Sequence, residues 1–263
     1  MAVITATSDY GIVDPALPAF KGRLFSAHPE AVVVDITHSI DVGNTGQAVH
    51  VLRTAFPSFP KGTVHIMLVG AHAWNTEKYI AMKANGQYFV GINNGVILAA
   101  LSNAKIQTAH EIDLRGKAHT DVHGILCETA VYLSKGGKID MLGPQITTLN
   151  RIVEPAPIVG EFSVGGVVSY VDRYGTCVTN IKKSHVPEEA HKHNLSVALP
   201  KNRHTQEVLE NPALARGGDL AAWWNSEGLL CVGIGGAGTK SSGKSNKLLG
   251  MEVNDWVRID FTI

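Results

Sequence analysis

The chain has 263 residues, of which 44% are hydrophobic and 17% charged. That is enough to form the hydrophobic core of one large domain or of two ordinary ones. Lys and Arg together number 23, as do Asp and Glu, so the formal net charge is zero and no nucleic-acid or anionic-membrane surface is indicated. The three cysteines are scattered and odd in number, which argues against disulfides and a cysteine-based zinc site. No apolar run approaches the ~20 residues of a membrane span and no basic segment opens a signal peptide, so we expect a cytoplasmic protein with no membrane partner.

The first half of the chain predicts a three-layer α/β/α domain with a mostly parallel sheet. Apolar runs predict strands over 1–6, 31–36 and 63–69, and a hairpin joining 79–82 to 88–91 across Asn85-Gly86. Helices are expected over 15–28, 46–56, 96–101 and 124–135. Asp14 is expected to cap the first helix, with Pro15 at its first position.

The second half has a different character. Pro155 and Pro157 flank an extended linker, and beyond them short strands separated by glycine are predicted over 165–171, 176–181, 195–199, 228–234 and 253–261. That pattern favours a small antiparallel barrel or sandwich. We therefore expect an N-terminal α/β domain over 1–157 and a C-terminal β-barrel domain over 158–263.

Polar residues follow the predicted parallel strands where each strand ends. Thr7-Ser8-Asp9-Tyr10-Gly11 follows the first strand, and Asp35-Ile36-Thr37-His38 closes the second. Ligands of open α/β sheets bind at the carboxyl ends of the strands, so these clusters predict a single crevice. The alternative is that Asp9 and Asp35 only cap helices or turns.

One phosphate-binding pattern is present but lacks its context. Residues 238–245 read GTKSSGKS, which fits G-x-x-x-x-G-K-[ST]. A working P-loop needs a long helix after it and a later strand with a magnesium-binding acid, whereas only 246–249 could be helical before Gly250. We interpret the stretch as a flexible loop.

One group of histidines and one hairpin are further candidate sites. His185, His191 and His193 could hold zinc with nearby carboxylates, but their polar surroundings favour a surface segment, and we expect no metal site. In the hairpin over 171–181, Tyr174 offers a ring face for a base and Asp172 could accept from an ammonium. The alternative is an ordinary hairpin with Asp172 in its turn.

Taken together, these stretches resemble the S-adenosyl-L-methionine (SAM) hydroxide adenosyltransferases, relatives of the fluorinating and chlorinating adenosyl enzymes. The resemblance is collinear over nearly the whole chain. It is carried by segments 7–11, 14–15, 21–22, 35–38, 59–65, 88–91, 94–95, 122–124, 171–175, 179–181 and 225–230. It implies an α/β domain followed by a small β-barrel, with SAM as substrate or ligand and no other cofactor. It also implies a homotrimer whose ligand lies between one subunit's N-terminal domain and its neighbour's barrel.

The resemblance assigns roles to particular residues. Asp9 would hold the ribose hydroxyls, Asp14 and Asp172 would face the methionine end, and Tyr174 would pack beside the adenine or sugar. Other residues implied to bind substrate are Tyr10, Thr37, Asn94, Asn225 and Ser226. The family reaction displaces methionine from ribose C5′ by water or hydroxide and gives adenosine.

The chain departs from the family pattern where water is activated. The family's Asp position is Gly70, its Arg position is Glu77 or Lys78, and only its histidine remains, as His123. Asn93 and Thr176 also replace the usual residues. We hypothesise that His72 orients or deprotonates the water and that Lys78 supplies the missing cation. The expected function is SAM hydrolysis; the alternatives are a nucleoside-binding protein without chemistry, or a pocket for a different nucleoside.

Overall fold

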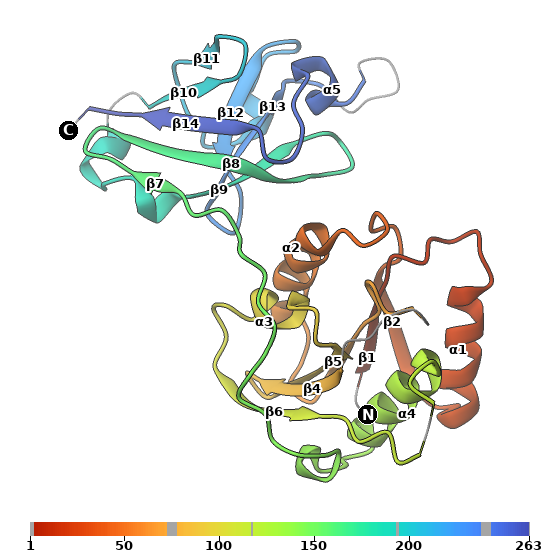
Figure 1. Cartoon of the computed structure of the whole chain (residues 1–263). Coiled ribbons are helices and arrows are strands. Elements are labelled where there is room, and N and C mark those ends of the chain that lie inside the picture. The colour runs from red at the N-terminus through yellow and green to blue at the C-terminus, as the bar shows by residue number, and fades with distance from the viewer. Residues whose placement is uncertain (1–2, 73–77, 117, 193–194, 238–242, 263) are drawn as a thin grey trace. The chain divides into compact units, whose positions relative to one another are not determined.

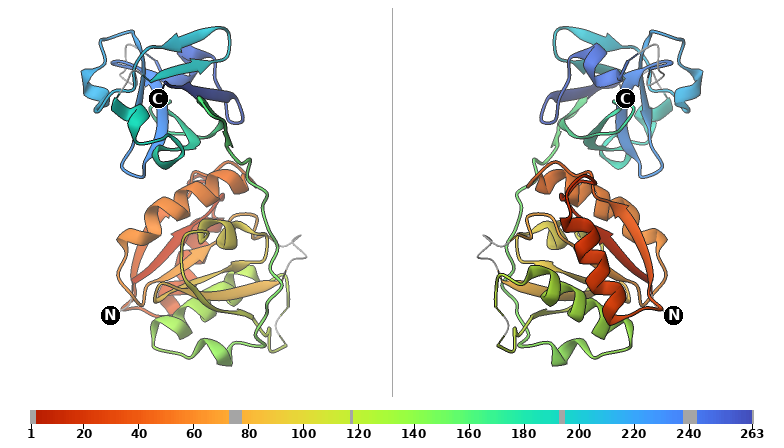
Figure 2. Two further views of the ribbon diagram at one scale, coloured as in Figure 1. Left: turned by 90° about the vertical axis from the view of Figure 1, so that its left-hand side faces the viewer. Right: turned by 90° about the vertical axis from the view of Figure 1, so that its right-hand side faces the viewer.

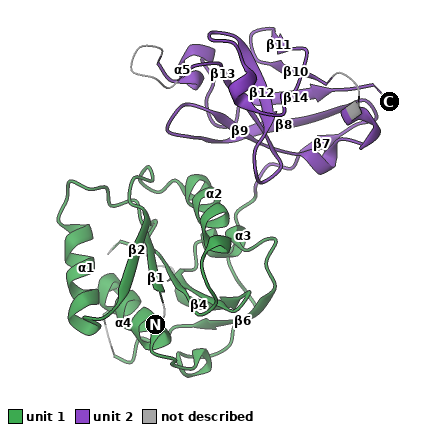
Figure 3. Ribbon diagram, turned by 180° about the vertical axis from the view of Figure 1, so that it is seen from behind, with its two compact units in different colours: residues 1–153 green, residues 154–263 purple. Residues whose placement is uncertain are grey.

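The structure is a computed structural model that describes residues 3–72, 78–116, 118–192, 195–237 and 243–262 (Figure 1). It divides into two compact units, Met1–Val153 and Glu154–Ile263 (Figure 3). The sequence placed this division at residue 157. Within the described ranges, no helix is long and apolar enough to cross a membrane.

Unit 1 is a six-stranded, mostly parallel sheet with helices on both faces (Figures 1 and 2). In spatial order its strands are β2 (Val32–Thr37), β1 (Val3–Thr7), β3 (Val64–Met67), β5 (Gln87–Ile92), β4 (Tyr79–Ala84) and β6 (Ile106–Glu111). The first four are parallel to one another, and β4 is antiparallel to both its neighbours. The predicted α/β class is confirmed.

The helices of unit 1 form two pairs with separate cores. Its α-helices are α1 (Ala16–Ala27), α2 (Thr45–Ala55), α3 (Val96–Ala100) and α4 (Val122–Ser134). α1 and α4 share one buried cluster that includes Phe20 and Leu126, whereas α2 and α3 share the other, which includes Val49 and Ile97. The sheet therefore lies between two helical layers.

Some local predictions about unit 1 need correction. The expected cap of the first helix is wrong: Pro15 is the N-cap residue of α1 and no side chain caps it, because the helix begins one position later than expected. The edge strand β6 was not predicted. The hairpin between β4 and β5 is confirmed, and its turn residues Asn85 and Gly86 both have positive φ, as a type I′ turn requires.

The segment after the 3₁₀ helix η2 (Ile139–Met141) returns across unit 1 before the chain leaves it. Gln145 bridges His110, and the backbone N–H of Asn150 donates to Asn93 Oδ1 at 3.0 Å. Ile146, Leu149 and Ile152 pack on the core shared by α2 and α3. These contacts explain why unit 1 extends to Val153.

Unit 2 is an antiparallel, nearly closed barrel, as predicted. The strand order is β11-β10-β14-β8-β9-β13-β12, with β7 beside β8. The strands are β7 (Ile158–Val159), β8 (Ser163–Val171), β9 (Cys177–Lys182), β10 (Ser196–Leu199), β11 (Arg203–Thr205), β12 (Leu220–Trp224), β13 (Leu229–Ile234) and β14 (Trp256–Asp260), with helix α5 at Ser245–Leu249. Strands β7, β11 and β12 were not predicted. Short 3₁₀ helices occur at Phe56–Ser58, Ile139–Met141 (η2), Lys183–His185, Glu189–Lys192 and Pro212–Leu214.

Candidate active site

The loops that follow the parallel strands of unit 1 meet at one edge of the sheet. Because β1, β2, β3 and β5 run in the same direction, the segments after them all lie at their carboxyl ends. Backbone bonds tie these segments together: Ser8 N–H donates to Thr37 O at 3.0 Å and Gly11 N–H to His38 O at 2.8 Å.

Asp9 joins three of these loops through one carboxylate oxygen. Its Oδ2 accepts from Gly43 N–H at 2.9 Å and from Gly70 N–H at 3.1 Å. Both glycines have a φ of 70°, a conformation that glycine adopts without strain. Within the described part of the chain Oδ1 has no hydrogen-bond partner, so this oxygen is available to a ligand hydroxyl.

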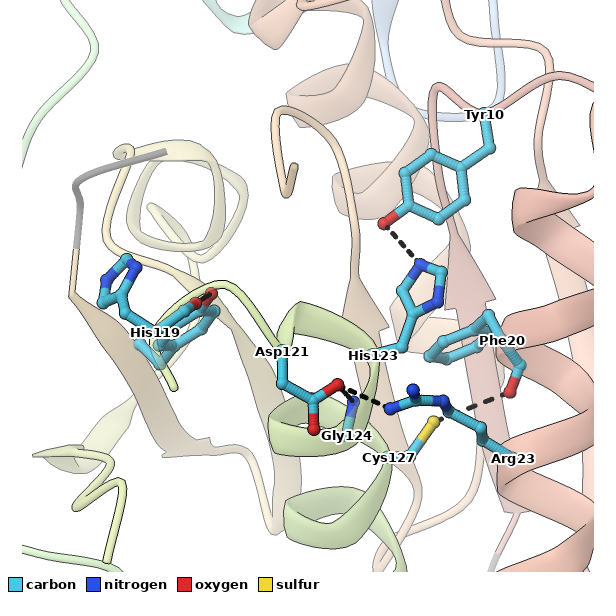
Figure 4. A network of polar contacts seen from close by, with 9 residues as sticks. Tyr10, Phe20, Arg23, His119, Asp121, His123, Gly124 and Cys127 are labelled. Carbon is cyan, nitrogen blue, oxygen red and sulfur yellow. Dashed lines mark hydrogen bonds and ion pairs between the residues drawn. The ribbon is translucent and has the colours of Figure 1, made fainter. Parts of the chain in front are cut away.

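Beside Asp9, Tyr10 meets His123 from the first turn of α4 (Figure 4). The Tyr10 hydroxyl donates to Ala71 O at 2.8 Å, and His123 Nε2 lies 3.2 Å from the same hydroxyl oxygen. The His123 ring centroid is 5.5 Å from that of Tyr10 and 5.7 Å from that of Phe20. The imidazole is therefore held between two aromatic rings at the sheet edge.

The start of α4 fixes where His123 stands. Asp121 is the N-cap: its Oδ1 accepts from Gly124 N–H at 3.2 Å and pairs with Arg23 of α1 at 2.5 Å. A Cβ on Gly124 would stand 2.1 Å from Asp121 Oδ2, so the cap itself requires glycine here. The helix therefore begins at Val122, before Gly124.

Burial sets the protonation of this cluster. Burial lowers the pKa of His123 and the nearby Arg23 lowers it further, while Asp121 opposes them. Burial, together with the neighbouring Asp9 charge, raises the pKa of Tyr10 well above its usual range. Burial also raises the pKa of Cys127 to about 12. At neutral pH the site thus offers a neutral imidazole beside a protonated phenol, and Cys127 stays a thiol.

A second chain of polar contacts links Ser8, His38, Asp35 and Lys21; the sequence placed the first three at strand ends but did not predict these contacts. Ser8 Oγ is 2.7 Å from His38 Nδ1, His38 Nε2 is 3.1 Å from Asp35 Oδ1, and Lys21 Nζ pairs with Asp35 Oδ2 at 2.5 Å. Burial of Asp35 is outweighed by the hydrogen bonds from Lys21 and His38, so its pKa is lowered. Ser8 is fully buried, so the chain braces the loop and offers no exposed nucleophile.

Other residues expected at this edge make mainly local contacts. Asn94 Nδ2 donates to Val69 O at 3.0 Å, and its Oδ1 accepts from Val96 N–H at 3.2 Å. Thr37 Oγ1 accepts from Ser39 N–H at 3.2 Å. Asp14 is exposed just before α1.

The two side chains proposed to replace the missing acid and arginine are not part of the Tyr10–His123 cluster. His72 is exposed, and within the residues that the structure describes its ring has no hydrogen-bond partner. Lys78 Nζ pairs with Glu111 Oε2 of β6 at 2.6 Å. Glu77, the other candidate for the arginine position, lies outside the described residues.

The candidate residues of unit 2 occupy two turns. Asp172 Oδ1 accepts from the backbone N–H groups of Tyr174 and Thr176, both at 2.8 Å. Asn225 Oδ1 accepts from the N–H groups of Glu227 at 3.0 Å and Leu229 at 2.9 Å.

These two turns lie at opposite ends of the paired strands β9 and β13. The turn at 172–176 precedes β9, whereas Gly228 of the other turn accepts from Lys183, just after β9. The Tyr174 side chain is 65% exposed and Ser226 is also exposed, so both can reach a ligand. Unit 2 by itself does not gather these residues into one cluster.

The remaining candidate motifs, the histidine group and the phosphate-binding pattern, either make hydrogen bonds to nearby backbone or lie outside the described residues. Among the residues that the structure describes, no group of three or more His, Cys, Asp or Glu could hold a metal ion. His185 Nδ1 accepts from Lys182 N–H at 3.1 Å, and His193 is not described. Residues 238–242 of the phosphate-binding pattern are also outside the described ranges, and Ser245 Oγ accepts from Ile234 N–H at 3.0 Å.

Comparison with known proteins assigns both halves of the chain. Residues 4–143 match the model of the SAM hydroxide adenosyltransferase N-terminal domain, and residues 166–258 match that of the C-terminal domain. The chain belongs to the SAM hydroxide adenosyltransferase family.

Similar family members and structures extend over most of the chain. An (R)-S-adenosyl-L-methionine hydrolase of Salinispora tropica is 26% identical over 97% of both chains. A protein of the same name from Methanocaldococcus jannaschii is 29% identical over 70% of this chain and 68% of its own, and a fluorinase of Actinopolyspora mzabensis is 22% identical over 88% and 89%. A crystal structure of an uncharacterized conserved protein from Thermotoga maritima has the same fold, with a TM-score of 0.86, 24% identity, and coverage of 98% of this chain and all of the other.

Proposed function

We propose that this family member hydrolyses SAM to adenosine and methionine by attack of water at ribose C5′. The observation that carries the proposal is the imidazole of His123, held neutral by burial and set against Tyr10, the residue that follows Asp9 at the carboxyl edge of the sheet. The relatives named (R)-S-adenosyl-L-methionine hydrolase support the choice of substrate and reaction.

The proposed reaction needs positioning more than activation. The Asp9 Oδ1 atom accepts a hydrogen bond from a ribose hydroxyl and fixes the sugar. His123 accepts a proton as the water oxygen bonds to C5′ and the C5′–S bond breaks. The electron pair of the C5′–S bond goes to sulfur, so methionine leaves with a neutral thioether and the positive charge passes to protonated His123. A desolvated water held in line with that bond supplies most of the rate enhancement.

We propose His123 ahead of His72 as the group that handles the proton. His123 is half-buried and oriented by contacts on two sides, whereas His72 is exposed. If His72 or Lys78 contributes, a ligand must bring it to the water. His72→Ala is expected to lower kcat less than His123→Ala does.

We also propose that the other half of the ligand site comes from a neighbouring subunit of a homotrimer. Beside Asp9, the aliphatic side chains of Ile12, Val13 and Val42 are 79%, 94% and 90% exposed. Such an apolar rim around a polar site favours cover by another protein surface. The turns that carry Asp172, Tyr174, Asn225 and Ser226 are the candidates for that surface.

The three buried, unpaired cysteines are consistent with a cytoplasmic location.

The test is incubation of the purified protein with SAM in H₂¹⁸O, followed by chromatography and mass spectrometry. We expect adenosine and methionine in equal amounts, with ¹⁸O in the 5′-hydroxyl of adenosine. His123→Ala should lower the rate on the order of 10²-fold, the usual scale for general acid–base help. His204→Ala is the matched control, because His204 is exposed on β11 in unit 2.

A second outcome has a specific structural motivation. Gly70 stands where the family has an acid and donates its N–H to Asp9 instead. Intact SAM at every time point, retained by the protein through gel filtration, would overturn the hydrolase proposal and favour a binding function.

A further inference from the structure

The Tyr10 hydroxyl lies within hydrogen-bond distance of two different groups. Ala71 O is 2.8 Å from the hydroxyl oxygen and His123 Nε2 is 3.2 Å from it (Figure 4). Neither contact is needed to bury the ring, because Tyr10 also packs on the core shared by α1 and α4. The hydroxyl therefore has a role that packing does not explain.

Counting hydrogens decides the direction of both bonds. A phenol has one hydrogen, and a backbone carbonyl can only accept. Two oxygens at 2.8 Å without a hydrogen between them would repel, so the phenol hydrogen points to Ala71 O. The remaining bond then requires that His123 Nε2 carry a hydrogen and donate it to the phenol oxygen. In the neutral ring the lone pair is left on Nδ1.

The surroundings keep both groups in these protonation states. Burial and the Asp9 charge hold the phenol protonated, with Tyr79 and Cys127 adding to the effect. Burial and Arg23 of α1 favour the neutral imidazole over its cation, and Asp121, which pairs with Arg23, opposes them. No other charged group that acts on His123 is found among the described residues of these elements.

We propose that Tyr10 is a positioning residue that fixes His123 as the Nε2–H tautomer, so that Nδ1 is the atom that receives the proton of the attacking water. The assignment of His123 as base rests on the proposed function, whereas the tautomer rests only on the contacts of Tyr10. A ring with the opposite tautomer would present an N–H where the reaction needs a lone pair.

The direct test is ¹⁵N NMR of the full chain labelled at histidine, since protonated and unprotonated ring nitrogens have widely separated shifts. The His123 signals are assigned by their loss in His123→Ala. In the wild-type protein at neutral pH we expect a protonated Nε2 and an unprotonated Nδ1. In Tyr10→Phe, which keeps the ring and removes the hydroxyl, we expect a mixture of tautomers.

The control is Tyr132→Phe. Tyr132, on α4, donates to Lys138 O at 3.3 Å, so the variant also removes one hydroxyl bonded to a carbonyl. It should leave the His123 signals unchanged. A wild-type spectrum with hydrogen on Nδ1 would overturn the proposal without any variant, and so would an unaltered tautomer in folded Tyr10→Phe.

Kinetics supply an independent readout. Tyr10→Phe should lower kcat for SAM hydrolysis about tenfold. It should leave KM within about twofold, because the aromatic ring at position 10 is kept and the surface that meets the substrate is unchanged. Equal changes in Tyr132→Phe would overturn the proposal. If the wild-type protein converts no SAM, the proposed function fails, while the NMR experiment still decides the tautomer.

Discussion

At the scale of single residues, the site is built on backbone donors that two glycines present to Asp9. Gly70 matters most, because the resemblance implies an acid at this position and the N–H of Gly70 donates to Asp9. A Cβ here would have room, with Asn94 Nδ2 at 3.5 Å and Ile92 Cδ1 at 3.7 Å, so the constraint comes from the φ of 70°. The position therefore tests backbone strain apart from steric clash.

Gly70→Ala should lower the free energy of unfolding by about 1 kcal/mol, the usual cost of a left-handed conformation for alanine. Gly22→Ala is the matched control. Gly22 lies in α1 with nothing within 4 Å of its added Cβ, and alanine there should raise stability by roughly 0.5–1 kcal/mol. Urea denaturation followed by circular dichroism would measure both. If both substitutions changed the free energy of unfolding in the same direction, the explanation by backbone strain at Gly70 would be contradicted.

Buried His65 makes the stability of unit 1 depend on pH. His65 of β3 is buried, stacks on Phe89 with ring centroids 4.8 Å apart, and has Nδ1 2.8 Å from Thr5 Oγ1. Burial lowers the pKa of His65 to about 4, with the Gln87 side chain opposing in part. The unfolded chain takes up this proton near pH 6.5 and the folded chain only near pH 4. Stability present above pH 6.5 is therefore lost as the pH falls toward 4.

We expect the wild-type protein to lose up to about 3 kcal/mol of stability to this group between pH 6.5 and 4. His65→Phe keeps an aromatic ring against Phe89 and cannot titrate, so its stability should fall less over the same range. Denaturation curves at several pH values give the comparison, and NMR titration of the His65 ring locates its pKa. A ring that titrates above pH 6 in the folded protein would refute the explanation.

At the scale of secondary-structure elements, the start of α4 shows what sequence patterns can and cannot supply. The apolar run after Gly124 predicts the helix, but the glycine suggests a weak start. In the structure Gly124 is required because the Asp121 carboxylate folds over it, a contact between side chain and backbone that residue preference does not contain. The cap brings Val122 and His123 into the helix and aims the imidazole at Tyr10.

The site shows the same division between what was predictable and what was not. Parallel strands and their polar ends predict that Asp9 and Thr37 share one edge, since chain direction alone fixes that result, whereas Asn94 was expected there only from the family resemblance. The partners of each side chain were not predictable, because Asp9 binds loops that are 34 and 61 residues away in the sequence. The edge strands β6, β11 and β12 escaped prediction because their patterns are short or mixed.

At the scale of the whole molecule, the chain is two units with separate hydrophobic cores. The change from alternating strands and helices to short strands predicts that organisation, whereas the last residue of unit 1 depends on tertiary contacts. Ile146, Leu149 and Ile152 belong to the core of α2 and α3 although they lie in irregular structure. A Cβ on Gly95 would stand 3.0 Å from Ile152, which shows how closely the returning segment is packed.

A fragment of residues 1–153 should therefore unfold cooperatively on its own, while 1–143 should be less stable by about 2 kcal/mol or more. The reason is that the shorter fragment uncovers apolar surface that three side chains bury in the longer one. Urea denaturation of both fragments, followed by circular dichroism, tests this. A gradual transition for 1–153, or equal midpoints for the two, would contradict the expectation.

The hydrogen bonds that Gly43 and Gly70 donate to Asp9 affect how this protein would respond to random mutation. A change at Asp9 removes the proposed ligand contact and also the bonds to the loops after β2 and β3, so a growth-based screen would score it as damaging even in a chain that catalyses nothing. Tyr10→Phe keeps the packed ring and the Asp9 contacts, removes one hydrogen bond to Ala71 O, and on our proposal changes which His123 nitrogen carries a hydrogen. Tolerance at position 10, set against intolerance at position 9, would thus separate selection for a folded protein from selection for a working one.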